Sequence, residues 1–308
     1  MATILANGIS LAYETHGDPA APPVLLVMGL GTTLTSWPGN FVDGLVEQGF
    51  YVIRFDNRDC GLSSSLDHLG RPNLPLSLLK HMLGWPMKSP YALDDMADDA
   101  LALLHALKVG PAHVIGASMG GMIAQIAAAR QPERVLSLTS IMSSSGRRGL
   151  PGPTRAARNA LMLAPKKNAS HEQVMAHMVG ACRAIGSPAY PIPERQLREA
   201  IQVSLKRNTN RAGALRQMLA VVAAPERGAL LGSIACPTLI IHGAADPLVP
   251  VACGIDTAKS IPHATLHVIE GMGHDMPPQL IERLLALIDM HLHVNMSAQT
   301  RIDRLSEA

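Results

Sequence analysis

The sequence predicts an α/β fold in which a mostly parallel sheet carries helices on both faces. Short apolar runs typical of fully buried strands alternate along the chain with longer stretches that favour helices. With 308 residues, 47% hydrophobic and 16% charged, the chain can fill the core of one large domain. The apolar runs lie at 24–28, 50–53, 113–116, 135–141, 236–242 and 265–269.

The N-terminal part predicts a hairpin, a strand and a helix. Residues 4–14 alternate in polarity around Asn7 and Gly8, a pair that favours a two-residue hairpin turn. The buried strand at 24–28 comes next, and a helix is expected at 36–48.

Residues 71–90 are apolar but interrupted by prolines. This stretch either lines a pocket or packs as an irregular surface segment, and the sequence does not separate the two. A helix is then expected at 93–107, because Asp94 and Asp95 in its first turn favour the positive end of a helix dipole.

Residues 143–233 differ from the rest of the chain, because they suggest helices and loops without a buried strand. They contain 14 Lys and Arg but 4 Asp and Glu, which gives +10 here and −8 elsewhere. We therefore predict a core domain of 1–142 and 234–308 with a helical cap subdomain of 143–233 inserted into it. The cap charge either attracts anionic substrates or faces the acidic core, and we favour the second interpretation.

The strand pattern resumes at 236–242 after the cap. A helix at 249–260, a strand at 265–269 and an amphipathic helix at 279–290 are expected to follow. The tail after His291 is polar and weakly patterned, so no element is predicted there.

Composition and charge argue against several classes of protein. The formal net charge of +2 and the absence of a recognition motif speak against a nucleic-acid partner. No 18-residue apolar run suggests a membrane span, and the N-terminus lacks the basic and apolar regions of a signal peptide. Four isolated cysteines predict reduced thiols and no metal site, in a cytoplasmic protein: Cys60, Cys182, Cys236 and Cys253.

Ser118 is the candidate nucleophile. It lies in the sequence GASMG at 116–120, between an apolar strand and an Ala-rich helix. The bare G-x-S-x-G pattern also arises by chance in Gly-rich turns, but the strand before it and the helix after it are the context that a nucleophile elbow needs.

A serine hydroxyl needs a base and an acid that orients the base. His274, in the sequence GMGHD at 271–275, is the candidate base, since a Gly-rich loop after a late strand can turn its ring toward Ser118. Asp246 follows another strand and is the candidate acid; the alternative is an Asp that only caps the next helix. The side chain of Asp275 is expected to point elsewhere.

Two backbone N–H groups are expected to bind the oxyanion. One belongs to Met119, directly after the nucleophile and at the positive end of a helix. The other is assigned to Leu30, in the loop GLG at 29–31, which is otherwise an ordinary strand-to-helix turn.

With these residues in place, the chain resembles the α/β-hydrolase superfamily along nearly its whole length, and most of all the esterases of the aclacinomycin-methylesterase-like branch. The matching segments are VMGLG at 27–31, FDNRDCGLS at 55–63, YALDDM at 91–96, GASMGG at 116–121, HGAADPLVP at 242–250 and GMGHD at 271–275. The resemblance implies an eight-stranded sheet with an inserted helical cap. It also implies that a small-molecule carboxylic ester is hydrolysed through a Ser–His–Asp triad and an acyl-enzyme, without a cofactor.

Substrate identity and oligomeric state stay open at this point. A lactonase or a carbon–carbon-bond hydrolase would use the same triad, and a slow ligand-binding sensor would keep the same fold. Many relatives carry His-Gly where this chain has Met28-Gly29. Trp37, Trp85 and Met162 are suggested as apolar substrate contacts, although a methionine in the cap more often packs than binds.

Overall fold

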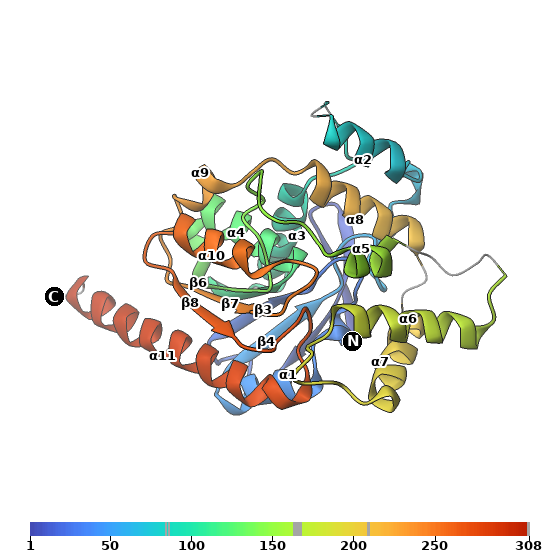
Figure 1. The fold of residues 1–308 in the computed structure, drawn as a ribbon. Helices are drawn as coiled ribbons and strands as arrows, with labels where there is room; N and C mark the ends of the chain where they lie inside the picture. The colour runs from blue at the N-terminus through green and yellow to red at the C-terminus, as the bar shows by residue number, and fades with distance from the viewer. Residues whose placement is uncertain (84, 86, 163–167, 208–209, 307–308) are drawn as a thin grey trace.

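The computed structural model describes residues 1–83, 85, 87–162, 168–207 and 210–306. In this part of the chain a single sheet has the strand order β1-β2-β4-β3-β5-β6-β7-β8. Figure 1 shows this sheet between its covering helices. β1 and β2, and β2 and β4, pair antiparallel, whereas the other neighbours are parallel. The predicted eight-stranded, mostly parallel sheet is confirmed. Its strands are β1 Ala2–Ala6, β2 Ile9–His16, β3 Pro23–Val27, β4 Tyr51–Phe55, β5 Ala112–Ala117, β6 Val135–Ile141, β7 Thr238–Gly243 and β8 Thr265–Ile269.

Helices cover both faces of the sheet, as predicted. Those described are α1 Gly39–Glu47, α2 Leu74–Met82, α3 Leu93–Ala106, α4 Met119–Arg130, α5 Arg155–Met162, α6 His171–Ile185, α7 Glu194–Arg207, α8 Arg211–Ala223, α9 Gly228–Leu231, α10 Val251–Ser260 and α11 Ile281–Ser306.

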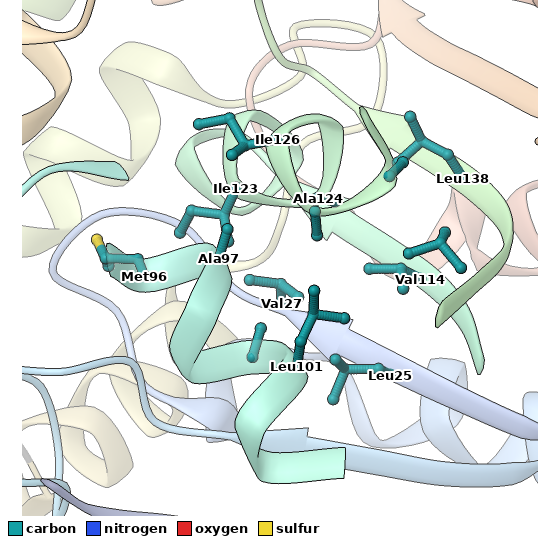
Figure 2. Close-up of a cluster of buried hydrophobic side chains, with 14 of the residues drawn as sticks. Leu25, Val27, Met96, Ala97, Leu101, Val114, Ile123, Ala124, Ile126 and Leu138 are labelled. Carbon is teal, nitrogen blue, oxygen red and sulfur yellow. The ribbon is translucent and has the colours of Figure 1, made fainter. Parts of the chain in front are cut away.

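β3 shows how the sheet separates two cores. Leu25 and Val27 belong to the cluster under α3 and α4, whereas Val24 and Leu26 belong to the cluster under α1 and α11. This alternation follows from the two-residue period of a strand, and it explains why all four residues are apolar. Figure 2 shows the first cluster, in which side chains of α3 and α4 meet those of the sheet: Leu101, Ile123, Ala124, Leu25, Val27 and Val114.

The structure changes several predicted boundaries. The strand expected at 50–53 is Tyr51–Phe55, and the helix expected at 36–48 is α1, preceded by a 3₁₀ turn at Leu34–Ser36. α11 does not stop near Met290 but continues to Ser306, and its end projects from the body of the molecule (Figure 1). The sequence after His291 is polar and carries no periodic apolar signal, so this extension was not predicted.

The stretch 71–90 contains α2. Four large apolar side chains in α2 and just after it are between 47% and 59% exposed, which is typical of a surface segment: Leu76, Leu79, Leu83 and Trp85. The same region also borders a hollow of about 380 Å³. Its lining combines residues of this stretch with one residue of the preceding 3₁₀ turn at Asp67–Leu69 and one of α8: Leu69, Pro72, Asn73, Ser77, Lys88, Ser89, Pro90 and Leu219.

The segment 143–233, described except for 163–167 and 208–209, contains helices α5–α9 and no strand. α6 and α7 share a small apolar cluster of their own, made of Met175, Val179, Leu197 and Ile201. In contrast, Ala220 of α8 and Leu231 of α9 belong to the cluster under α3 and α4. Among the described helices, none is both long and apolar enough to cross a bilayer.

Candidate active site

Ser118 occupies a sharp turn between β5 and α4. Its backbone φ of 55° and ψ of −119° lie where residues other than glycine are strained. A Cβ atom on Gly120 would lie 1.9 Å from the carbonyl oxygen of Val27, and one on Gly116 would lie 2.2 Å from that of Gly120. Only glycine fits at these two positions, so the close approach of strand, loop and helix depends on them.

The imidazole of His274 connects Ser118 with Asp246. Nε2 of His274 lies 2.9 Å from Oγ of Ser118, and Nδ1 lies 2.7 Å from Oδ2 of Asp246. Ser118 follows β5, Asp246 follows β7 and His274 follows β8, so parallel strands bring the three to one edge of the sheet. A carboxylate at Nδ1 keeps the proton there and leaves Nε2 free to accept one.

Asp246 is held by more than the histidine. Its Oδ1 accepts hydrogen bonds from the backbone N–H groups of Leu248 at 2.9 Å and Val249 at 2.8 Å. Asp246 is 6% exposed and His274 is 9% exposed, so their mutual interaction is poorly screened by water. The carboxylate therefore has the hydrogen bonds that fix its orientation toward the ring.

His242 is a neighbour of the site that the sequence did not identify. Its Nε2 donates to the carbonyl oxygen of Val249 at 2.7 Å and lies 3.6 Å from Oδ2 of Asp246. Burial lowers the pKa of His242 below its ordinary value, which favours the neutral ring. A neutral His242 does not neutralise the Asp246 carboxylate that faces His274.

The loop 29–31 packs against Ser118. A Cβ atom on Gly29 would lie 3.3 Å from Cβ of Ser118. The backbone N–H groups of Leu30 and Met119 thus belong to the two segments that flank the serine, one after β3 and one at the start of α4.

Two amide side chains that the sequence did not single out hold this loop. Oε1 of Gln217, on α8, accepts from the N–H of Gly31 at 2.7 Å, and its Nε2 donates to the carbonyl of Arg58 at 2.8 Å. Nδ2 of Asn57 donates to the carbonyl of Met28 at 2.9 Å. Gln217 is 186 positions from Gly31, and no local pattern indicates a contact at that separation.

The three predicted substrate contacts lie in different environments. Trp37 is 1% exposed and stacks on Phe41 in the core, with ring centroids 5.3 Å apart. Trp85 is 59% exposed at the surface. Met162 is the last residue of α5, and its side chain lies outside the described part of the structure.

Cys60, Cys182, Cys236 and Cys253 form no disulfide. Within the described ranges, no three His, Cys, Asp or Glu side chains are grouped as metal ligands would be.

Comparison with known proteins places most of the chain in one family. Residues 22–278 match the family described as alpha/beta hydrolase fold. The chain is 31% identical to the rhodomycin D methylesterase DauP of Streptomyces sp. strain C5, over 94% of its length and 96% of that protein. It is 30% identical to the rhodomycin D methylesterase DnrP of Streptomyces peucetius, with the same coverage.

Solved structures agree at the level of the fold. A meta-cleavage product hydrolase from Pseudomonas fluorescens IP01 superposes with a TM-score of 0.73, covering 95% of this chain and 97% of the other. The two sequences are 20% identical, so this likeness extends to the fold alone.

Proposed function

Because the chain belongs to the alpha/beta hydrolase fold family, we propose that it hydrolyses carboxylic esters with Ser118 as nucleophile, His274 as general base and Asp246 as the orienting acid. One observation carries the proposal. A single imidazole lies 2.9 Å from the serine hydroxyl and 2.7 Å from a buried carboxylate. This is the hydrogen-bonded order that activates a serine for acyl transfer.

The reaction proceeds in two halves. Oγ of Ser118 attacks the ester carbonyl carbon while Nε2 of His274 takes its proton. The tetrahedral intermediate collapses, the C–O bond to the alcohol breaks, and His274 returns the proton to the departing alcohol. Water then attacks the acyl-enzyme with His274 again as base, and the carboxylic acid leaves as Ser118 recovers its proton.

The N–H groups of Leu30 and Met119 are proposed to bind the oxyanion. Two features support this role: the loop 29–31 packs against Ser118, and Met119 begins α4, where the N-terminal dipole favours negative charge. Loss of one such donor costs roughly 3–4 kcal/mol of transition-state stabilisation. Gln217 and Asn57 would keep the loop in place without touching the substrate.

We further propose a methyl ester of a small molecule as substrate, because the two methylesterases named above are at least 30% identical over almost the whole chain. The segment 143–233 would serve as a cap over the site. Its contacts support this, since Ile185 and Gln217 of the segment hydrogen-bond to His274 and to the loop 29–31, respectively.

A substrate panel with the Ser118→Ala variant tests the proposal. Wild-type protein is expected to hydrolyse 4-nitrophenyl acetate and the methyl ester of rhodomycin D, and Ser118→Ala to lose about 10⁴-fold or more of kcat. Ser137→Ala is a matched control. Ser137 is also buried, but its hydroxyl lies 2.8 Å from Nδ1 of His113 and not in the site, so this variant is expected to keep wild-type activity.

The same panel separates the alternative functions. Faster turnover of a lactone or a vinylogous diketone than of any ester would favour the lactonase or carbon–carbon-bond hydrolase. Saturable binding without turnover would favour a ligand sensor. Unchanged ester hydrolysis in Ser118→Ala would contradict the assigned mechanism.

A further inference from the structure

The loop that carries His274 interlocks with the connection between α6 and α7. The backbone N–H of His274 donates to the carbonyl of Ile185 at 2.7 Å, and that of Ala189 donates to the carbonyl of Gly271 at 3.3 Å. The approach is very close: a Cβ atom on Gly273 would lie 2.4 Å from the carbonyl oxygen of Gly186. Backbone contact alone therefore joins 185–189 to 271–274.

Ser187 adds side-chain contacts on both sides of His274. Its hydroxyl oxygen accepts from the N–H of Gly273 at 2.8 Å, and its O–H donates to the carboxylate of Asp275. Ser187 is 4% exposed, so both contacts are sheltered from water. One hydroxyl thus fixes the residue before and the residue after the proposed base.

Among the residues that the structure describes, no Lys or Arg forms an ion pair with Asp275. The groups that face it are the thiol of Cys182 on α6, the hydroxyl of Ser187, and the site residues His274 and Asp246. Burial raises the pKa of Asp275, while its hydrogen bonds to Ser187 oppose that change. The hydrogen bond of Ser187 therefore also stabilises a carboxylate next to the imidazole.

We propose that Ser187 and Asp275 are positioning residues for His274, so that the α6–α7 connection is part of the device that aligns the imidazole. The inference rests on the function proposed above. The imidazole must reach Ser118 and Asp246 at once, at 2.9 and 2.7 Å, while its loop contains Gly271 and Gly273. Flexible glycines next to the base make an external support necessary, and Ser187 provides it.

Two variants separate alignment from charge. Ser187→Ala removes the hydroxyl but keeps the Asp275 carboxylate. Asp275→Asn keeps a group of the same shape that can bond to Ser187 but removes the negative charge. If alignment alone matters, the neutral amide in Asp275→Asn supports His274 as the carboxylate does. Asp246, His242 and Ser118, which also face the ring, are unchanged in both variants.

The measurements are kcat and KM for 4-nitrophenyl acetate and the rate of phosphorylation of Ser118 by diethyl 4-nitrophenyl phosphate. Ser187→Ala is expected to lower kcat and the phosphorylation rate together by about tenfold or more, with KM within about twofold. Asp275→Asn is expected to keep kcat, KM and the phosphorylation rate within about twofold of wild type, because its amide oxygen can still accept the hydrogen bond of Ser187. Ser137→Ala is the control, because Ser137 is buried but hydrogen-bonds to His113. It is expected to leave kcat, KM and the phosphorylation rate unchanged.

Specific results would contradict the positioning role of Ser187 and Asp275. Wild-type kcat and phosphorylation rate in a folded Ser187→Ala variant would overturn the positioning role, as would a change in KM alone. If Ser187→Ala does not fold, a tenfold or greater loss of kcat in Asp275→Asn would overturn it instead, because that variant keeps an acceptor for Ser187 and removes only the charge. Hydrolysis that is lost in Ser118→Ala but intact in Ser187→Ala contradicts only this inference, whereas hydrolysis that survives Ser118→Ala contradicts the proposed function as well.

Discussion

At the scale of single residues, the conformation of Ser118 depends on its neighbours. A non-glycine residue at φ 55° and ψ −119° costs on the order of 1–3 kcal/mol. The N–H of Ser118 donates to the carbonyl of Ile141 at 2.9 Å, and the packing at Gly116 and Gly120 leaves no room for another path. The strain is thus imposed by the strands and helix around the serine.

A pair of glycine substitutions tests this dependence. Gly120→Ala is expected to lower the free energy of unfolding by about 3 kcal/mol or more, because its Cβ would meet a backbone oxygen at 1.9 Å. Gly180→Ala in α6 has nothing within 4 Å of its Cβ and is expected to raise that free energy by about 0.5–1 kcal/mol. Urea unfolding of both variants measures the difference, and equal effects would contradict the steric explanation.

At the scale of elements, local patterns predicted most of the structure that positions the site. Apolar runs located the strands before the three proposed triad residues, because buried parallel strands need continuous apolar sequence. The serine, acid and base were each found from the turn that follows a strand. The confirmed sheet then explains why residues so distant in sequence lie together.

Contacts between distant segments could not be predicted in the same way. Ser187 and Asp275 are 88 positions apart, and nothing in either neighbourhood indicates the other. The same holds for Gln217 and Gly31. The predicted helix at 279–290 also ended too early, because the distal end of α11 follows no apolar period. Sequence periodicity reports which face of an element is buried, but not which partner covers it.

Ion pairs attach the basic segment 143–233 to the acidic core. Arg216 of α8 lies 2.6 Å from Asp59, with both side chains fully buried, and 2.8 Å from the more exposed Asp67. Arg207 of α7 lies 2.9 Å from Asp56, and Arg147 pairs with Asp256 on α10 at 3.0 Å. These pairs support the interpretation that the positive charge of the segment faces the core.

Arg216→Met is therefore expected to be strongly destabilising. Removing the guanidinium leaves the buried carboxylate of Asp59 without its charge partner, which costs about 3–5 kcal/mol. Arg195→Met is the control, because Arg195 is 90% exposed in its pair with Glu199 and its loss should leave the unfolding midpoint unchanged. A small effect at Arg216, measured by urea unfolding, would show that Asp59 is satisfied by other groups.

At the scale of the whole molecule, buried histidines predict how stability depends on pH. Burial lowers the pKa of His113 and of His291 to about 4 in the folded protein. In the unfolded chain a histidine has a pKa near 6.5. The unfolded state therefore binds protons first as the pH falls, and stability that is complete above about pH 6.5 is lost progressively toward pH 4.

The variant His113→Asn should weaken this acid dependence. Between about pH 6 and 4.5, each such histidine contributes a slope near 1.4 kcal/mol per pH unit, so the variant loses about that much of the slope. The same substitution at the exposed His263 serves as control and is expected to leave the slope unchanged. Urea unfolding across this pH range is the measurement, and an identical slope in His113→Asn would contradict the explanation.

The separation of the site residues along the chain has a consequence for synthesis of the protein. Ser118 and His274 are 156 positions apart, and the histidine follows β8, the last strand to be made. A growing polypeptide on the ribosome therefore contains the serine long before its proposed base, His274, is made. Under the proposed mechanism, the nascent chain acquires ester hydrolysis only after β8 has joined the sheet and His274 lies beside Ser118.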